Sequence, residues 1–170
     1  MILNNYGNYV IQKIFSCSSS SLKSTLLEWI EKDFINIVKT KAGTHSLQSI
    51  VCLLDLDNLQ KIYQIIDGVE VDISNDEFGT HFMQMLVEHN INYDFITKIL
   101  NNFTEIACNK YGIVVLKKIM KLTGVDFNIR YYLLQVCQNN FNEVSDTEYG
   151  HYIIEELFLY YNEHELQTIL

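Results

Sequence analysis

The sequence predicts an all-α protein, an α-solenoid in which short helical repeats stack in a row. Proline is absent and glycine occurs only seven times in 170 residues, so helix-breaking positions are few. A glycine-led apolar pattern recurs five times, with a period near 36 residues. Within each copy the apolar positions lie three and four residues apart, which is the spacing of an amphipathic helix.

The composition favours a soluble intracellular protein. With 48% hydrophobic and 19% charged residues, the chain can bury a core as one domain or as a short repeat array. The net charge of -9 argues against non-specific binding to phosphate backbones. Cys17, Cys52, Cys108 and Cys137 form no CxxC pair and no zinc-like spacing, which predicts free, mostly buried thiols and no metal or cofactor. The sequence shows no secretory signal and no membrane span.

Each copy of the repeat begins at a glycine that follows an aromatic residue or alanine. The copies read YGNYVIQKIF, AGTHSLQSIV, FGTHFMQMLV, YGIVVLKKIM and YGHYIIEELF, and their glycines are Gly7, Gly43, Gly79, Gly112 and Gly150. Because a residue without Cβ fits where a preceding loop crosses closely, we assign the glycines a structural role.

The similarity between copies continues upstream of the glycine. An aliphatic residue lies six positions before four of the glycines, at Ile37, Ile73, Ile106 and Val144. A phenylalanine lies nine positions before three of them, at Phe34, Phe103 and Phe141. Amphipathic stretches such as LKSTLLEWI and NLQKIYQII precede these positions. We therefore expect two helices in each repeat, with each repeat covering the apolar face of its neighbour.

One face of the glycine-led helix is apolar and predicts the core. The third, fourth, seventh and eighth residues after the glycine are apolar in nearly every copy, and Ser46 is the exception. They are Val10, Ile11, Ile14 and Phe15; Leu47, Ile50 and Val51; Phe82, Met83, Leu86 and Val87; Val115, Leu116, Ile119 and Met120; Ile153, Ile154, Leu157 and Phe158. Full burial of one such side chain contributes roughly 1.5–3 kcal/mol, so this face accounts for the fold without any function.

A second face of the same helix carries a triplet formed by the first, second and fifth residues after the glycine. The triplets are Asn8, Tyr9 and Gln12; Thr44, His45 and Gln48; Thr80, His81 and Gln84; Ile113, Val114 and Lys117; His151, Tyr152 and Glu155. The first and fifth residues lie one helical turn apart and project side by side. Polar side chains there match the edge of a planar heterocycle, and an aromatic second residue provides a stacking surface. The alternative is that they cap the helix and face water, and their repetition in register favours ligand binding.

The period, the aromatic-glycine lead and the triplets resemble Pumilio (PUF) repeats over essentially the whole chain, most closely in GNYVIQ, GTHSLQ and GTHFMQ. The resemblance implies a right-handed α-solenoid in which each glycine-led recognition helix reads one base of single-stranded RNA. The first and fifth residues would contact the base edge and the second would stack between bases. The strand would run antiparallel to the protein, so that the N-terminal repeat meets its 3′ side.

The same resemblance divides the chain into repeats that look like repeats two to six of an eight-repeat domain. Residues 1–20 would hold the recognition helix of a truncated repeat, 21–54, 55–90, 91–123 and 124–161 complete repeats, and 162–170 the start of an uncompleted repeat. This incomplete array should leave Val10, Ile11, Ile14 and Phe15 without a partner on one side. We expect a fragment, a reduced gene product, or one member of an assembly that covers the ends.

The first three triplets fit the family's base-reading pattern to different degrees. Asn8 and Gln12 with Tyr9 match the combination that reads uracil. Threonine at the first position of the next two triplets, Thr44 and Thr80, replaces the residues that sharpen the choice between uracil and adenine. Those two repeats should therefore be permissive, with Gln48 and Gln84 at the base edge and His45 and His81 stacking.

The last two triplets depart further from the pattern. Ile113, Val114 and Lys117 supply neither an amide edge nor an aromatic plane, and Lys117 and Lys118 are expected to meet phosphate instead. Glu155 resembles the glutamate that reads guanine, with Tyr152 stacking, but His151 could equally form a local pair with it. These two interpretations of the last triplet stay open, and its neighbours Asp146, Glu148 and Glu156 should weaken RNA binding at that end.

The resemblance implies a non-enzymatic, cytoplasmic protein that binds uracil-containing single-stranded RNA in mRNA 3′ untranslated regions. It further implies repression or decay of the message through recruited protein co-repressors, with neither a membrane nor a small-molecule substrate as partner. One alternative is a protein-interaction scaffold whose RNA surface has decayed. Another is a nucleolar RNA-processing protein, although the acidic charge disfavours it. The histidines outside the triplets, His89 and His164, lie without a convergent nucleophile or metal set, so catalysis is disfavoured.

Overall fold

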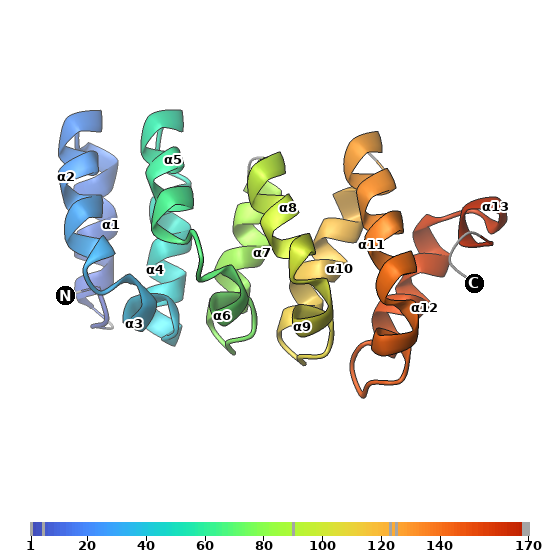
Figure 1. The fold of residues 1–170 in the computed structure, drawn as a ribbon. Coiled ribbons are helices and arrows are strands. Elements are labelled where there is room, and N and C mark those ends of the chain that lie inside the picture. Colours follow the sequence, from blue (N-terminus) through green and yellow to red (C-terminus); the bar gives the residue numbers. More distant parts are fainter. Residues whose placement is uncertain (1, 5, 90, 123, 125, 168–170) are drawn as a thin grey trace. The chain divides into compact units, whose positions relative to one another are not determined.

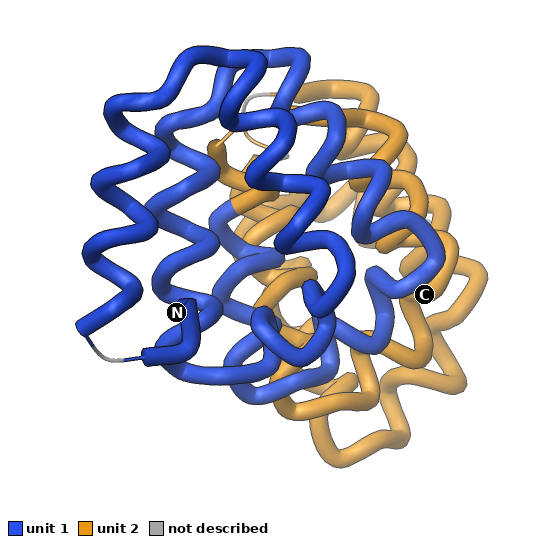
Figure 2. Tube along the Cα trace, turned by 90° about the vertical axis from the view of Figure 1, so that its left-hand side faces the viewer, with its two compact units in different colours: residues 1–85 blue, residues 86–170 orange. Residues whose placement is uncertain are grey.

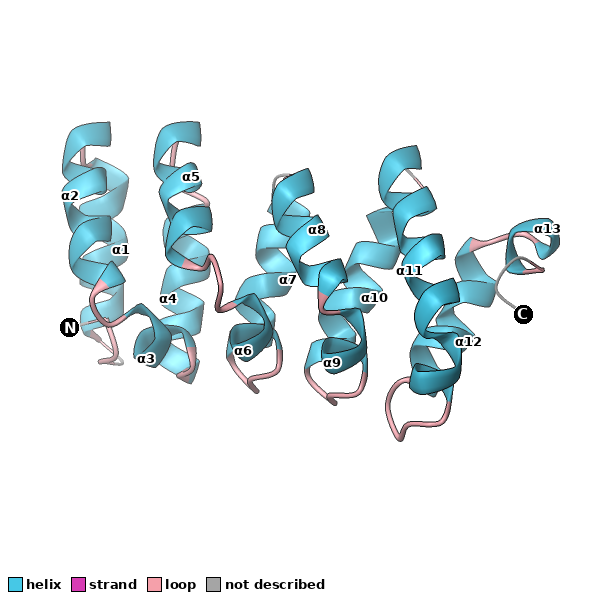
Figure 3. Cartoon of the chain, in the orientation of Figure 1, coloured by secondary structure: helices cyan, strands magenta, loops and turns pink. Residues whose placement is uncertain are grey.

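A computed structural model describes residues 2–4, 6–89, 91–122, 124 and 126–167. These residues form helices and turns and no strand, which confirms the predicted all-α class (Figures 1 and 3). The chain divides into two compact units, residues 1–85 and 86–170 (Figure 2). Among the described residues, no helix combines the length and the apolar character that a membrane crossing requires.

Unit 1 arranges its helices in two layers. Its elements are α1 (Gly7–Cys17), α2 (Ser20–Glu31), α3 (Phe34–Val38), α4 (Lys41–Val51), α5 (Leu56–Ile65), α6 (Glu70–Ser74) and the first part of α7 (Gly79–His89). The glycine-led helices α1 and α4 pack on each other, and α2 packs on α5 (Figure 1). The recognition helices therefore form one layer, and the helices that precede them form the other.

Unit 2 repeats this arrangement. Its elements are the end of α7, α8 (Tyr93–Asn101), α9 (Phe103–Ala107), α10 (Gly112–Leu122), α11 (Phe127–Ser145), α12 (His151–Tyr160) and α13 (Glu163–Leu166). Here α10 packs on α12 in one layer, and α8 packs on α11 in the other.

The expectation of two helices per repeat is wrong for three of the repeats. A five-residue helix, α3, α6 or α9, separates the first helix from the recognition helix. The breaks fall at Asp33, at Gly68 with φ of 82°, and at Asn102, which lies between α8 and α9. In the next repeat the two segments are continuous in the 19 residues of α11, where Asn140 Nδ2 donates to the carbonyl of Val136 at 2.7 Å.

The glycines have the structural role expected from the sequence. A Cβ atom on the glycine would collide with the carbonyl oxygen of the aliphatic residue six positions earlier. The distances would be 2.0 Å for Gly43 to Ile37, 2.5 Å for Gly79 to Ile73 and 2.2 Å for Gly150 to Val144. The start of each of these recognition helices therefore lies directly against the segment that precedes it.

The recognition helices are capped by the side chain three residues before the glycine. In all five copies an Asn, Thr or Asp oxygen accepts a hydrogen bond from the glycine N–H. The distances are 2.9 Å for Asn4, 3.1 Å for Thr40, 2.8 Å for Asp76, 3.2 Å for Asn109 and 3.0 Å for Thr147. The triplet residues do not make these bonds, so the alternative that they cap the helix and face water is wrong in its capping part, whereas the second residue of each triplet is exposed as that alternative expects. The caps stand at one fixed offset from the glycine, and this offset in the sequence was the signal from which they could have been predicted.

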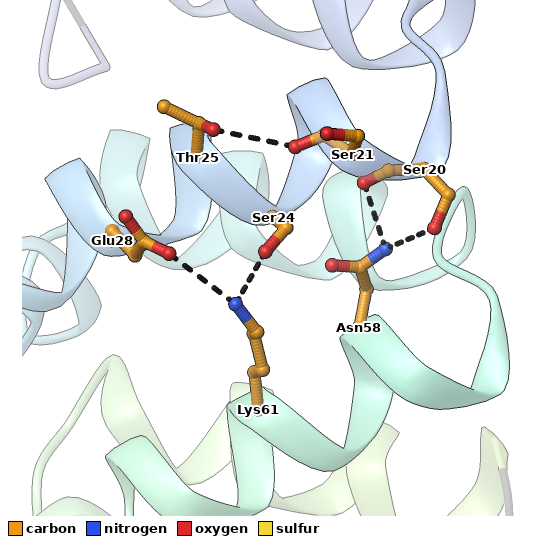
Figure 4. A network of polar contacts seen from close by, with 7 residues as sticks. All are labelled: Ser20, Ser21, Ser24, Thr25, Glu28, Asn58 and Lys61. Atoms are coloured by element: carbon orange, nitrogen blue, oxygen red, sulfur yellow. Dashed lines mark hydrogen bonds and ion pairs between the residues drawn. The ribbon is translucent and has the colours of Figure 1, made fainter.

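In unit 1, polar contacts join α2 and α5, the helices that precede the recognition helices (Figure 4). Asn58 Nδ2 donates to the hydroxyl of Ser20 at 2.9 Å and to its carbonyl at 3.2 Å. The ammonium of Lys61 contacts Ser24 Oγ and lies 3.4 Å from Glu28 Oε1. These bonds link residues 33 to 38 positions apart, so they fix one repeat against the next.

The predicted apolar stripe is buried in α4, α7 and α10 but only in part at the ends of the array. In α1, Val10 is 51% and Ile14 38% exposed, whereas Phe15 is 1% exposed. The predicted lack of a partner is confirmed for Val10 and Ile14, holds only in part for the half-buried Ile11, and is wrong for Phe15. A groove of about 460 Å³ runs along this side of α1, between Tyr9 and Cys17. In α12, Phe158 is likewise exposed.

The cysteines are free thiols, as expected, but the prediction that most are buried is wrong. Cys17 and Cys52 are exposed because they stand at the ends of α1 and α4, where the helix leaves the core. Cys108 is half-buried. Only Cys137 on α11 is buried, and this burial raises the pKa of its thiol to about 12.

Candidate nucleic-acid interface

The three positions of each triplet differ in exposure in a regular way. The second residue is exposed in all five copies: Tyr9, His45, His81, Val114 and Tyr152. The first residue is buried in four: Asn8, Thr44, Thr80 and Ile113. The fifth residue is half-buried in four: Gln12, Gln48, Gln84 and Lys117. Each copy therefore presents an exposed second residue, and in α1, α4 and α7 this residue lies beside a partly covered polar pair.

In α1 the base-edge pair consists of two amides with unmet hydrogen-bonding capacity. Asn8 is 8% exposed, and its Oδ1 has no hydrogen-bond partner; the same is true of Gln12 Nε2. One atom is an acceptor and the other is a donor, and they belong to side chains one helical turn apart. A buried polar atom without a partner costs about 1–3 kcal/mol. Both atoms are covered by the protein, so a ligand would recover part of this free energy only after the two side chains turn outward.

In α4 the base-edge role predicted for Thr44 is only partly compatible with the structure. Its hydroxyl donates to the carbonyl of Phe78 in the following repeat at 3.0 Å, and the side chain is 4% exposed. The hydroxyl proton is therefore already committed within the protein. Gln48 is half-buried and His45 is exposed, which leaves these two side chains to meet a ligand.

In α7 the first and fifth residues contact each other. Gln84 Nε2 donates to Thr80 Oγ1 at 3.4 Å, which is a long hydrogen bond. The contact holds the glutamine next to the buried threonine, and His81 is exposed beside them.

In α10 the lysines predicted to meet phosphate are paired with carboxylates of the protein. Lys117 Nζ lies 3.0 Å from Glu156 Oε2, and Lys118 Nζ lies 2.5 Å from Glu88 Oε1. Ile113 is buried, and Val114 is 40% exposed. This helix therefore offers an incoming strand an aliphatic side chain and two cations that already have partners.

In α12 the proposed local pair of His151 and Glu155 is not what the structure shows. His151 Nδ1 lies 3.1 Å from the carbonyl of Thr147, and its ring centroid is 3.9 Å from that of Tyr152. Glu155 is exposed, so its carboxylate can still meet a base. Just before this helix, a hydrogen bond with Glu148 raises the pKa of Tyr149.

The described residues contain no group of three or more His, Cys, Asp or Glu side chains that could hold a metal ion.

Sequence comparisons point to one family. The sequence profile of the Pumilio-family RNA binding repeat (PUF) matches residues 1–28, 71–100 and 102–124. The putative pumilio homolog 13 of Arabidopsis thaliana is 22% identical over 122 residues, which are 70% of this chain and 23% of that protein. The suppressor protein MPT5 of Saccharomyces cerevisiae is 29% identical over 136 residues, which are 72% of this chain and 16% of that protein. The chain thus spans less than a quarter of the length of these relatives.

Solved structures share the fold. A Puf4 mutant bound to the Cox17 RNA 3′ UTR recognition sequence gives a TM-score of 0.82 at 19% identity, over 93% of this chain and 49% of that one. The RNA-binding domain of yeast Puf5p bound to SMX2 RNA gives a TM-score of 0.71 at 27% identity, over 92% of this chain and 46% of that one. The fold class is therefore the α-solenoid of PUF domains, of which this chain spans about half.

Proposed function

We propose that the chain binds single-stranded RNA through the triplets of its recognition helices, with uracil read by α1. The match of residues 1–28, 71–100 and 102–124 to the Pumilio-family RNA binding repeat supports this function. RNA-bound structures of the same fold support RNA binding by the PUF repeats. The choice of uracil and the residues that make it are our proposal.

The observation that carries the proposal is the pair of unpartnered amide atoms in α1. Uracil presents an N–H donor flanked by carbonyl acceptors on its base-pairing edge. Once the two side chains turn outward, Asn8 Oδ1 can accept from that N–H while Gln12 Nε2 donates to a neighbouring carbonyl. Tyr9 is 65% exposed next to them, so its ring is accessible for stacking on a base. The two amides would distinguish the base, and the ring would add affinity for any base.

The expected affinity is modest because few bases are read well. Stacking on an aromatic side chain contributes about 1–3 kcal/mol per base, and association costs offset part of this gain. With two or three bases read in unit 1, the dissociation constant is expected to be roughly micromolar. The net charge of -9 opposes binding through general electrostatics, so the contribution of the triplets should be visible above the background.

A fluorescence anisotropy titration with short labelled RNAs tests the proposal. The RNAs should differ only in whether the base at the 3′ side is uracil or another base. Asn8→Ala and Gln12→Ala are expected to weaken binding to the uracil RNA about tenfold each and to remove the preference. Ser16→Ala is the matched control on the same helix, since Ser16 is exposed and bonds to the carbonyl of Lys13. Equal affinity for both RNAs in the parent chain would rule out base reading by α1.

We further propose that the RNA partners are mRNA 3′ untranslated elements and that binding represses the message or promotes its decay in the cytoplasm through recruited proteins. The support is that structures of this fold hold 3′ UTR recognition sequences. Crosslinking of the tagged protein in cells, followed by sequencing of bound RNA, should recover 3′ untranslated regions. A predominance of ribosomal precursor RNA would instead favour nucleolar processing.

A second candidate is a protein-interaction scaffold, which the ion-paired lysines of α10 and the acidic charge favour. Affinity capture from an extract with and without RNase separates the two functions. Partners that persist after RNase treatment, combined with no RNA binding by the purified chain, would establish the scaffold instead.

A further inference from the structure

The ion pair between Lys117 and Glu156 joins two recognition helices of unit 2. Lys117 occupies the fifth, base-edge position of α10, and Glu156 follows the corresponding position of α12. The atoms Nζ and Oε2 are 3.0 Å apart, and the two side chains are 33% and 18% exposed. Because the pair is partly shielded, salt screens it less than it screens a fully exposed pair.

The same lysine also lies near the side chain predicted to stack on a base in the last repeat. Its ammonium is 5.8 Å from the centroid of the Tyr152 ring, within range of a cation–π interaction. The ring of His151 lies at 3.9 Å from the Tyr152 ring, tilted by 42°. Lys117, His151 and Tyr152 all belong to the triplets, so in this unit the reading side chains contact one another.

We propose that Glu156 prevents Lys117 of α10 from contacting the RNA backbone and so limits the affinity for RNA. This inference rests on the proposed RNA-binding function. Glu156 holds the ammonium of Lys117 on the protein, beside the Tyr152 ring, and so withholds the cation from the RNA backbone. A phosphate that captured Lys117 would leave the carboxylate of Glu156, which is only 18% exposed, without its partner. The free energy lost with the ion pair offsets the free energy gained from the contact between Lys117 and phosphate. A bound strand therefore makes its stabilising contacts in the preceding repeats.

Unit 1 shows no equivalent ion pair among its described triplet residues. The fifth residues of its three triplets are glutamines, Gln12, Gln48 and Gln84, which carry no charge to be neutralised. The loss of this phosphate contact therefore arises from a lysine and a glutamate that occur together only in the later repeats. Removing the carboxylate should extend the surface that RNA contacts.

A double-mutant cycle in the full chain tests this inference. Glu156→Gln keeps the shape of the side chain and removes its charge, and it is expected to tighten binding to a uracil-containing RNA about five- to tenfold. One added phosphate contact should also steepen the plot of log affinity against log salt by about 0.7. Both effects should disappear in the Lys117→Met background, because the gain requires the released ammonium.

Glu143→Gln is the control for a general change in charge, since Glu143 is exposed on α11 and is outside the triplets. An equal gain from Glu143→Gln, or an undiminished gain in the Lys117→Met background, would overturn the inference in favour of a general electrostatic effect. So would no gain from Glu156→Gln in a folded protein, with folding checked by circular dichroism.

The Asn8→Ala variant, measured in the same series, separates this inference from the proposed function. If the parent binds RNA and loses affinity with Asn8→Ala while Glu156→Gln has no effect, only the inference fails. If the parent binds no RNA, both fail.

Discussion

The short helices α6 and α9 occupy the same place in successive repeats and have the same length, yet they bury different side chains. In α9, Phe103, Ile106 and Ala107 are buried. In α6 the corresponding buried residues are Glu70, Ile73 and Ser74, with Glu70 5% and Ser74 0% exposed. Glu70 Oε1 and Ser74 Oγ have no hydrogen-bond partner.

The difference shows that the backbone of this part of the repeat does not depend on apolar side chains at all of its buried positions. Ile73 and Ile106 are both fully buried at the same position, and Gly79 lies directly against the carbonyl of Ile73. The cap at Asp76 then starts α7 in the same way that Asn109 starts α10. These contacts keep α6 in place although two of its buried side chains are polar, at a cost in stability.

The largest effect on stability is expected when Phe103 of α9 is replaced by glutamate, the residue at the corresponding position of α6. Phe103→Glu should lower the free energy of unfolding by about 3–5 kcal/mol, because it removes a buried aromatic side chain and introduces a carboxylate. Chemical denaturation measures the change. Phe103→Leu is the control and should cost less than about 1.5 kcal/mol. A small loss with Phe103→Glu would mean that the position tolerates a carboxylate in either repeat.

The next effect concerns the glycine that anchors α6. Gly79→Ala should destabilise the chain by about 2–3 kcal/mol, since the new Cβ would lie too close to the carbonyl oxygen of Ile73. Thermal unfolding followed by circular dichroism is the measurement. Gly124→Ala serves as a control because the nearest atom to its added Cβ, at 3.8 Å, is in ordinary contact. Equal melting temperatures for the two variants would contradict the anchoring role.

A smaller, stabilising effect is expected from a substitution that makes the buried residues of α6 more like the apolar ones of α9. Glu70→Leu should raise the free energy of unfolding by about 1–2 kcal/mol, because an apolar side chain of similar size replaces the buried carboxylate. Glu70→Gln removes the charge while keeping the shape, and it separates the contribution of charge from that of apolar burial. A loss of stability with Glu70→Leu would contradict the prediction and would mean that the carboxylate of Glu70 makes a stabilising contact.

The smallest effect is expected at Ser74. Ser74→Ala reproduces Ala107 of α9 and removes a buried hydroxyl without a partner, so it should stabilise by about 0.5–1 kcal/mol. Ser46→Ala is the contrasting control, since the hydroxyl of Ser46 donates to the carbonyl of Ala42 at 2.8 Å. A gain at Ser46 as large as the gain at Ser74 would argue against unmet hydrogen bonding as the cause.

The sequence predicted the helical class, the repeat and the apolar stripe because these depend on spacing along one chain segment. The short helices α3, α6 and α9 were not predicted, since five residues are too few for an amphipathic period to be read. The burial of Glu70 was not anticipated either. Its position, nine residues before Gly79, is where other repeats carry phenylalanine, and this offset was the available signal.

The triplets were identified from their register, but their contacts were not. The bond from Thr44 to Phe78 and the ion pair of Lys117 with Glu156 join residues 34 and 39 positions apart. Such contacts depend on how neighbouring helices pack and on which rotamers the side chains adopt. Periodicity in the sequence carries no information on either, so it could show which residues share a face but not which of them already have partners.

The cap lies at a constant distance from the glycine in every repeat, so triplets can be exchanged between repeats by their offset from the glycine. Successive glycines are 33 to 38 residues apart, whereas the cap always stands three residues before the glycine. Length differences are therefore absorbed in the loops and first helices, where an insertion leaves the recognition helix in register. One residue inserted between Gly112 and Lys117 would instead turn Lys117 by about 100° around the helix axis. An engineered exchange of triplets should therefore match residues by their distance from the glycine and not by their distance from the preceding repeat.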